Sequence, residues 1–173
     1  VKTIPIPYYT GTLDIHVAEE NLKAVVTAKM HHYKAEKGEE ELVREALENP
    51  IGSPKLRELA KGKKRVTLVT SDHTRAVPSK ITLPILLAEI REGSPEAEIT
   101  IHRPTTPEEQ RRMFGDAIVD HERIVVNDAF KPEDFVHVCP LPSGADFEVN
   151  RLAVDCDLLV TEGFIEPHFF AGF

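Results

Sequence analysis

The sequence contains no tryptophan and only two cysteines, and aromatic residues make up just 6% of its 173 residues. Two cysteines, Cys139 and Cys156, are too few for a disulfide scaffold, and they lack the C-x-x-C spacing of a zinc or redox pair. We therefore expect each of them to be a small buried apolar residue rather than a reactive thiol.

Long apolar runs and an excess of positive charge are also missing. No run approaches the roughly 18–20 apolar residues that span a bilayer, and residues 1–5 hold no apolar signal core. The sequence thus predicts a cytoplasmic protein with no membrane partner. The formal net charge of −8 argues against a nucleic-acid partner, which normally requires a basic surface. No Walker loop, nucleophile elbow, H-E-x-x-H or G-x-G-x-x-G motif occurs.

The remaining composition is that of a globular protein, with 41% hydrophobic and 29% charged residues. A chain of this length is sufficient for one domain with a core and too short for two ordinary domains. We therefore expect a single domain over residues 1–173. The sequence contains no signal for an oligomeric state.

Strand-like and helix-like segments alternate along most of the chain. Strand patterns lie at residues 3–6, 12–17, 65–70, 98–101, 124–126, 135–138 and 158–161. Helical patterns occupy two short segments within residues 36–62, residues 78–93, and a segment starting at Pro107. Pro84 disfavours a helix interior, so the regular part of the 78–93 helix is expected to begin just before it. This alternation predicts a Rossmann-like α/β fold, with a largely parallel sheet flanked by helices.

Titratable side chains follow three of the predicted strands directly. These residues are Asp72, His73 and Arg75 after the first, His102 and Arg103 after the second, and Glu162, Glu166 and His168 after the third. The carboxyl ends of parallel strands share one edge of a sheet, so these groups should converge there. Two imidazoles can serve as an acid/base pair near neutral pH. Arg75 precedes a helix N-terminus and can grip a carboxylate or phosphate.

Structural roles are the alternative for each of these residues. Asp72 can simply organise a turn through local backbone bonds, and Arg75 can be an ordinary surface arginine. Loop histidines are often solvated or bonded structurally. The histidines outside the three loops are interpreted as structural, and they are His16, His31, His32, His121 and His137.

Three motifs occur in the polar loops in a fixed order: D-x-T-R at residues 72–75, H-R-P-T-T at 102–106 and E-P-H-x-x-A-G at 166–172. With these motifs the sequence resembles the nickel-dependent lactate racemase family, in particular its N-terminal domain. The resemblance covers most of residues 65–173. It implies that the chain is the N-terminal part of a longer racemase or epimerase acting on a 2-hydroxy acid.

The resemblance also implies a mechanism and a set of site residues. The family uses a nickel-pincer nucleotide, Ni(II) pyridinium-3,5-bisthiocarboxylic acid mononucleotide, which receives the α-hydrogen of the substrate as hydride. One histidine removes the hydroxyl proton of the substrate, and a second histidine serves the other enantiomer. By matching motif, these histidines are His102 and His168. Asp72 and Arg75 match polar residues that bind substrate or cofactor, and no residue of this chain matches a metal ligand.

Two departures from the family pattern lead to further expectations. The family has a short Ala-Thr-Gly-containing turn before its His-Arg, whereas Ile101 runs directly into His102 here. We therefore expect a break in the chain between Ile101 and His102. The lysine that holds the cofactor and a nickel-ligating histidine belong to the family sequence beyond the point matching Phe173. The fragment alone is accordingly expected to bind no cofactor and to be inactive.

Two other functional classes remain open. One is an anion- or nucleotide-binding domain without catalysis, which would use Arg75 and the neighbouring helix N-terminus. The other is a nickel-free hydrolase or transferase that would use His102 or His168 as a general base.

Overall fold

A computed structural model of the chain describes residues 1–102, 105–168, 170 and 172. Its strands are β1 (Lys2–Tyr8), β2 (Gly11–Val17), β3 (Arg65–Val69), β4 (Glu98–His102), β5 (Arg123–Val125), β6 (Phe135–Pro140), β7 (Asp146–Asn150) and β8 (Leu158–Thr161). Its α-helices are α1 (Glu39–Glu48), α2 (Leu56–Ala60), α3 (Ser79–Gly93), α4 (Pro107–Phe114), α5 (Asp116–His121) and α6 (Arg151–Val154). Short 3₁₀ helices cover Glu19–Asn21, Lys29–His32 and Pro132–Asp134. Within the described residues, no helix is long and apolar enough to cross a membrane.

The chain divides into two compact units, residues 1–36 and residues 37–173. In the first unit β1 and β2 form an antiparallel hairpin, in which Ile4 pairs with Ile15 and Ile6 pairs with Leu13. Directly paired residues share a face of a hairpin, so these four side chains make one face apolar. The α/β architecture expected for residues 1–173 is thus confined to the second unit. That residues 1–173 are one domain of a longer chain stays a prediction.

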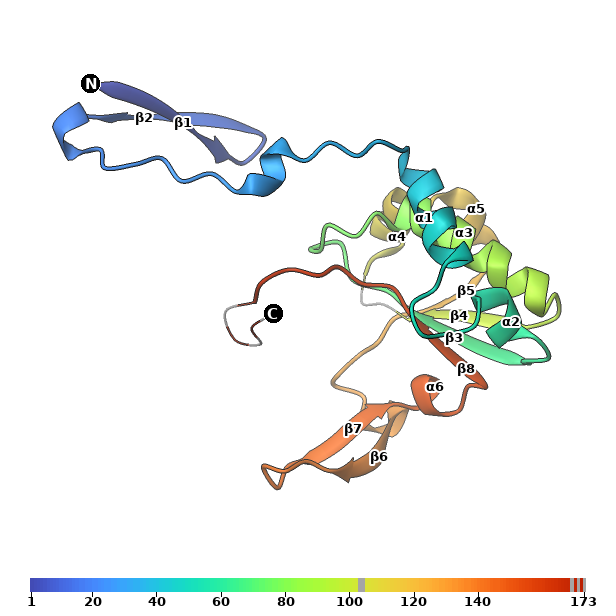
Figure 1. Ribbon diagram of the computed structural model, residues 1–173. Coiled ribbons are helices and arrows are strands. Elements are labelled where there is room, and N and C mark those ends of the chain that lie inside the picture. Colours follow the sequence, from blue (N-terminus) through green and yellow to red (C-terminus); the bar gives the residue numbers. More distant parts are fainter. Residues whose placement is uncertain (103–104, 169, 171, 173) are drawn as a thin grey trace. The chain divides into compact units, whose positions relative to one another are not determined.

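The second unit is built on a four-stranded parallel sheet with the order β5-β4-β3-β8, which confirms the predicted α/β fold. Helices α3, α4 and α5 lie on one face of this sheet and α6 lies on the other (Figure 1). Parallel strands are joined by right-handed crossovers. From β3 to β4 and from β4 to β5 the chain moves across the sheet in one direction, whereas from β5 to β8 it crosses back in the opposite direction. The connections therefore pass over opposite faces.

The hydrophobic core lies between the sheet and helix α3. Val66 and Leu68 of β3 point to the same face because side chains alternate along a strand. They are at most 1% exposed and belong to one cluster with Leu83 and Ile90 of α3 and Ile99 of β4. The intervening Thr67 points to the other face, where its hydroxyl donates to the Leu152 carbonyl of α6 at 2.7 Å.

The helix that contains Pro84 begins earlier than expected. It starts at Ser79, five positions before the proline, so the expectation of a start just before Pro84 is wrong. Proline lacks a backbone N–H and removes one hydrogen bond of the helix. Burial of Leu83, Ile85 and Ile90 along the same helix outweighs that loss.

Two other expectations need correction. Cys139 is exposed, because it lies on a two-stranded hairpin of β6 and β7, and only Cys156 is partly buried. The 135–138 strand pairs antiparallel with β7, a strand that the sequence analysis did not predict, so it lies outside the parallel sheet. Ile101 and His102 are consecutive residues of β4, paired with Leu68 and Val69, and that a turn of the family is missing between them stays a prediction.

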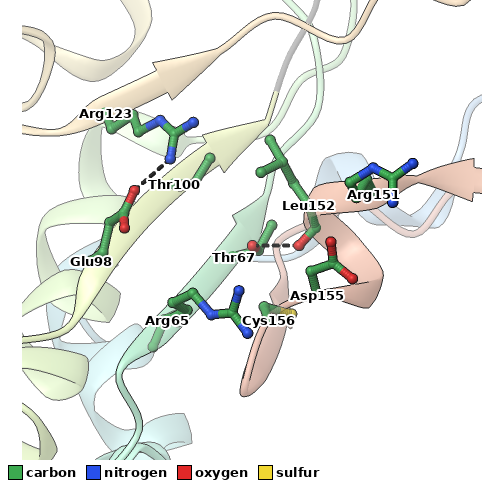
Figure 2. Close-up of a pocket in the computed structure, with 10 residues that line it drawn as sticks. Arg65, Thr67, Glu98, Thr100, Arg123, Arg151, Leu152, Asp155 and Cys156 are labelled. Carbon is green, nitrogen blue, oxygen red and sulfur yellow. Dashed lines mark hydrogen bonds and ion pairs between the residues drawn. The ribbon is translucent and has the colours of Figure 1, made fainter. Parts of the chain in front are cut away.

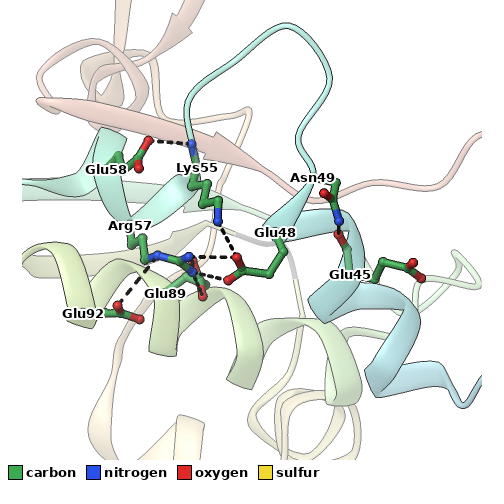
Figure 3. Close-up of polar contacts among 8 residues, drawn as sticks. All are labelled: Glu45, Glu48, Asn49, Lys55, Arg57, Glu58, Glu89 and Glu92. Atoms are coloured by element: carbon green, nitrogen blue, oxygen red, sulfur yellow. Dashed lines mark hydrogen bonds and ion pairs between the residues drawn. The ribbon is translucent and has the colours of Figure 1, made fainter.

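An ion-pair cluster joins three helices (Figure 3). Arg57 of α2 contacts Glu48 of α1 at 2.5 Å and Glu89 of α3 at 3.0 Å, and Lys55 contacts Glu48 at 2.5 Å. Hydrogen bonds from Arg57 and then from Lys55 lower the pKa of Glu48 to about 2. The cluster therefore favours the folded arrangement of α1, α2 and α3 most strongly when Glu48 is ionised.

Candidate functional site

The candidate site lies at the point where the strand order reverses. In the sheet, β3 lies between β4, which is the next strand of this sheet along the chain, and β8, which is the last strand. The connection that leaves β3 passes over the α3 face, and the one that enters β8 passes over the α6 face. At such a point, open α/β sheets bind ligands in a crevice beyond the carboxyl ends of the strands. The segments that border it are residues 70–78 after β3 and residues 162–168 after β8. Both contain residues predicted for the site.

A carboxylate and three hydroxyl groups hold these two segments together. Glu162 directly follows β8, and its Oε2 accepts hydrogen bonds from Thr70 Oγ1 at 2.5 Å and from Ser79 Oγ at 3.0 Å. Its Oε1 accepts from Thr82 Oγ1. Ser79 and Thr82 belong to the first turns of α3. The negative charge therefore lies beside the positive end of the α3 dipole. Glu162 was predicted among the titratable residues that follow this strand, but its hydrogen bonds were not, since the spacing of the three hydroxyls along the chain has no recognisable pattern.

Arg75 and Glu166 form a second link between the two segments. Arg75 Nη1 lies 2.9 Å from Glu166 Oε1, and the two side chains are 51% and 41% exposed. The helix N-terminus that was expected to assist Arg75 in anion binding is already used by Glu162. An anion entering the crevice would therefore be bound by the guanidinium more than by the helix. Arg75 is accessible enough to do this.

Asp72 organises the turn that carries Arg75. Its Oδ1 accepts from the Thr74 backbone N–H at 2.9 Å and from the Thr74 hydroxyl, and its carbonyl accepts from the Arg75 N–H at 3.1 Å. This is the turn-forming role considered as an alternative from sequence. The same turn fixes the backbone position of Arg75, so Asp72 also helps to place the Arg75 side chain in the candidate site.

His73 connects the same turn to the segment after β4. Its Nε2 lies 3.4 Å from Glu109 Oε1 in the first turn of α4. The backbone N–H of Thr106 is the main cause that lowers the pKa of Glu109, and nearby His73 and Arg112 contribute less. An ionised Glu109 forms a capping box with Thr106 and attracts a protonated His73.

The two predicted acid/base residues lie on different strands of the sheet edge. His102 is the last residue of β4 and is paired with Val69, directly before the 70–78 segment. Its side chain lies outside the described residues, as do residues 103 and 104. His168 ends the 162–168 segment, where its Nδ1 accepts the Phe170 backbone N–H at 3.1 Å. A neutral His168 ring with this bond carries its proton on Nε2, where it can donate a hydrogen bond.

The structure thus joins Asp72, Arg75 and the segment that ends in His168, and it places His102 on the adjacent strand. The histidines predicted to be structural include His16 and His137, which contact Thr3 and Asp146 within the two hairpins. Among the residues that the structure describes, no three histidine, cysteine, aspartate or glutamate side chains are grouped as metal ligands.

A separate pocket of about 260 Å³ lies between α6 and the sheet, toward the amino ends of the strands (Figure 2). It is lined by Arg65, Glu98 and Arg123, which begin β3, β4 and β5, and by residues of and after α6. Arg123 forms an ion pair with Glu98 across its rim. None of the predicted site residues lines this pocket, since they follow the carboxyl ends of the strands.

The chain is similar to known proteins over nearly its full length. Residues 8–173 match the family described as the lactate racemase N-terminal domain. The chain is 47% identical to a lactate racemase of Thermoanaerobacterium thermosaccharolyticum and 43% identical to one of Lactiplantibacillus plantarum. These alignments cover 100% and 98% of this chain but only 42% of each relative.

A solved structure shares the fold. The lactate racemase apoprotein from Thermoanaerobacterium thermosaccharolyticum matches with a TM-score of 0.87 and 44% sequence identity, over 97% of this chain and 40% of that one. The family match covers nearly the entire chain, including all three polar loops. The chain therefore belongs to the lactate racemase N-terminal domain family.

Proposed function

We propose that this chain is the N-terminal part of a longer isomerase that racemises or epimerises a small 2-hydroxy acid such as lactate. The observation that carries this proposal is the 43–47% identity to two lactate racemases along essentially the whole chain. The position of the polar loops at the reversal point of the sheet supports it, because that is where α/β sheets bind ligands.

In this proposal Arg75 binds the substrate carboxylate. A guanidinium has five N–H donors in a planar fork, and one edge can accept a carboxylate while Nη1 still contacts Glu166. Asp72 holds the turn from which Arg75 projects and can contact substrate or cofactor.

His102 and His168 would exchange protons with the substrate hydroxyl. A racemase must act on both mirror-image substrates, and two bases on either side of a planar intermediate accomplish this simply. The histidines follow different strands, so they can approach one carbon from two directions. A neutral His168 accepts a proton only at its unprotonated nitrogen, so as a base it would take the substrate proton at Nδ1, in place of the Phe170 N–H, and later return that proton from the imidazolium.

The family resemblance further implies reversible hydride transfer, for which a nickel-pincer nucleotide supplies the hydride acceptor when it is bound. The described residues include no group of three metal-ligating side chains, so we assign no nickel ligand to them. We propose instead that attachment and metal ligation belong to the part of the longer chain that the relatives have beyond this domain. The histidines and Arg75 then act on the substrate alone.

The test is a racemisation assay on the longer protein, loaded with cofactor. L-lactate and D-lactate are supplied separately, and the opposite enantiomer is quantified by chiral chromatography. We expect conversion in both directions to the same equilibrium ratio, and absorbance from a bound organic cofactor. Binding of lactate without conversion by the loaded protein would favour an anion-binding domain. Hydrolysis or group transfer without such absorbance would favour the nickel-free enzyme, and either result would contradict the proposal.

A further inference from the structure

Glu162 has a dense set of hydrogen bonds to the segments around it, and the proposed function assigns it no role. Its carboxylate accepts from Thr70, Ser79 and Thr82, and its backbone N–H donates to the Val69 carbonyl at 2.8 Å. Val69 ends β3 and Thr70 directly follows it, whereas Ser79 and Thr82 lie in the first turn of α3. One residue after β8 is thereby fixed to both ends of the 70–78 segment.

The hydroxyl groups are arranged for a carboxylate. Thr70 and Ser79 are only 6% and 1% exposed, and their oxygens lie 3.3 Å apart, so both reach Glu162 Oε2 from the protein interior. Thr82 Oγ1 also lies 3.2 Å from the Pro78 carbonyl, in addition to its bond to Glu162. Buried hydroxyls without an acceptor are costly, so removal of this carboxylate would force them to rearrange.

The geometry has consequences at the far ends of both segments. The 70–78 segment carries Arg75, and the 162–168 segment carries Glu166 and His168. The two segments also touch through the ion pair of Arg75 and Glu166, which is exposed and joins a single pair of atoms. Exposed ion pairs restrain the positions of their residues only weakly. The partly buried bonds of Glu162 are therefore the stronger determinant of how the two segments face each other.

We propose that Glu162 is a positioning residue, which fixes the 162–168 segment against the 70–78 segment and so sets Arg75 and His168 at the distance that turnover requires. This inference rests on the proposed function for its kinetic consequence only. The structural part, that the carboxylate restrains the 162–168 segment, holds whatever ligand occupies the crevice.

The experiment uses the longer, cofactor-loaded protein and a matched pair at the partner residue. Thr82→Val removes the hydroxyl donor with little change in shape, whereas Thr82→Ser retains it. Glu162→Ala and Glu162→Gln form a second pair, in which glutamine retains an acceptor oxygen. Glu133→Ala, at an exposed glutamate on the 132–134 helix, serves as the control. Each variant is assayed for kcat and KM with lactate, for its unfolding midpoint and for hydrogen exchange of residues 162–168.

We expect Thr82→Val to lower kcat by about tenfold and Glu162→Ala by about a hundredfold, because small misplacements of reacting groups have effects of this size. KM should change less than kcat, Thr82→Ser should match the wild type, and Glu162→Gln should recover part of the loss. Exchange of residues 162–168 should accelerate about tenfold in Thr82→Val, since a hydrogen bond to a charged group is lost.

Equal behaviour of Thr82→Val and Thr82→Ser in both measurements would overturn the proposal, even if Glu162→Ala fails to fold. A lower unfolding midpoint with unchanged kcat per folded molecule would likewise reduce Glu162 to a stability role. If the wild-type protein does not racemise lactate, the proposed function is wrong. The exchange comparison then still decides whether Glu162 restrains the segment.

Discussion

Arg75 Nη1 lies 2.9 Å from Glu166 Oε1, and this contact joins the loop after β3 to the loop after β8 across the reversal point of the sheet. The two residues are separated by 91 positions in sequence. Each belongs to one of the motifs that carry the family resemblance. Their contact therefore brings two separate sequence signatures into one site.

Replacement of Arg75 tests its assignment to the substrate carboxylate. In the longer protein, Arg75→Ala should raise the KM for lactate by about 10–100-fold, because hydrogen bonds to a charged group contribute about 1.5–3 kcal/mol. Steady-state kinetics with both enantiomers measure the effect. Arg44→Ala, on the exposed surface of α1, is the control and should leave KM unchanged. An unchanged KM in Arg75→Ala would mean that another cation binds the substrate.

Alanine variants of the two histidines test the acid/base assignment. Positioned general bases contribute about 10²–10⁴-fold, so His102→Ala and His168→Ala should each slow racemisation by about that range. At equilibrium the forward and reverse fluxes must balance, so each variant should slow both directions.

The difference between the histidines should appear in single-turnover cofactor reduction with each pure enantiomer. One variant should react poorly with L-lactate and the other with D-lactate. Wild-type rates for both variants with both enantiomers would show that the histidines are structural.

Close packing of α2 on α3 predicts a strong effect at Gly93. A Cβ added there would lie 2.0 Å from the backbone oxygen of Arg57. Alanine gains about 1 kcal/mol of helix propensity over glycine, but this approach between backbones cannot be relieved by a rotamer change. We expect Gly93→Ala to lower the free energy of unfolding by about 1–3 kcal/mol.

Denaturant titration measures that change, with Gly38→Ala as the matched glycine control. An added Cβ at Gly38 meets nothing within 4 Å, and its φ of −68° suits alanine. The control should therefore change the unfolding free energy by less than about 1 kcal/mol. Equal changes in the unfolding free energy for Gly93→Ala and Gly38→Ala would show that α2 and α3 do not pack closely at Gly93.

The ion-pair cluster of Glu48 predicts a pH dependence of stability. The pKa of Glu48 is lowered to about 2 in the folded protein from an ordinary value of 4.5. A lowered pKa means that its contribution is fully present above pH 4.5 and is lost as the pH falls toward about 2. The unfolding midpoint of the wild type should thus decline more steeply over this range than that of Glu48→Gln.

Added salt should reduce the difference, because Glu48 is 47% exposed and its ion pairs are screened. Thermal unfolding at several pH values and two salt concentrations measures both effects. Parallel pH curves for wild type and Glu48→Gln would contradict the assigned ion pairs.

Local sequence was sufficient to predict most of the second unit. Its strands and helices follow from short patterns of apolar residues, and polar loops after strands predicted where a site would form. The two strands of the first hairpin were also predicted as strand-like runs, but their antiparallel pairing was not. The helix start at Ser79 was not, because burial of Leu83, Ile85 and Ile90 in the core outweighs the local effect of Pro84. Strand β7 was missed because Asp146–Asn150 is a short run in which three of the five residues are aspartate, glutamate or asparagine, although polar and apolar residues alternate along it.

The sequence by itself therefore determined the α/β class, the family and the residues that border the site, since these depend on local pattern and on motifs. Only the tertiary structure decided how the loops are joined. The order β5-β4-β3-β8 brings Glu162 to Thr70, Ser79 and Thr82, and Glu166 to Arg75, across 80 to 92 positions. No local pattern encodes such contacts. They arise because β8 pairs with β3 in the parallel sheet, which places the ends of distant segments side by side.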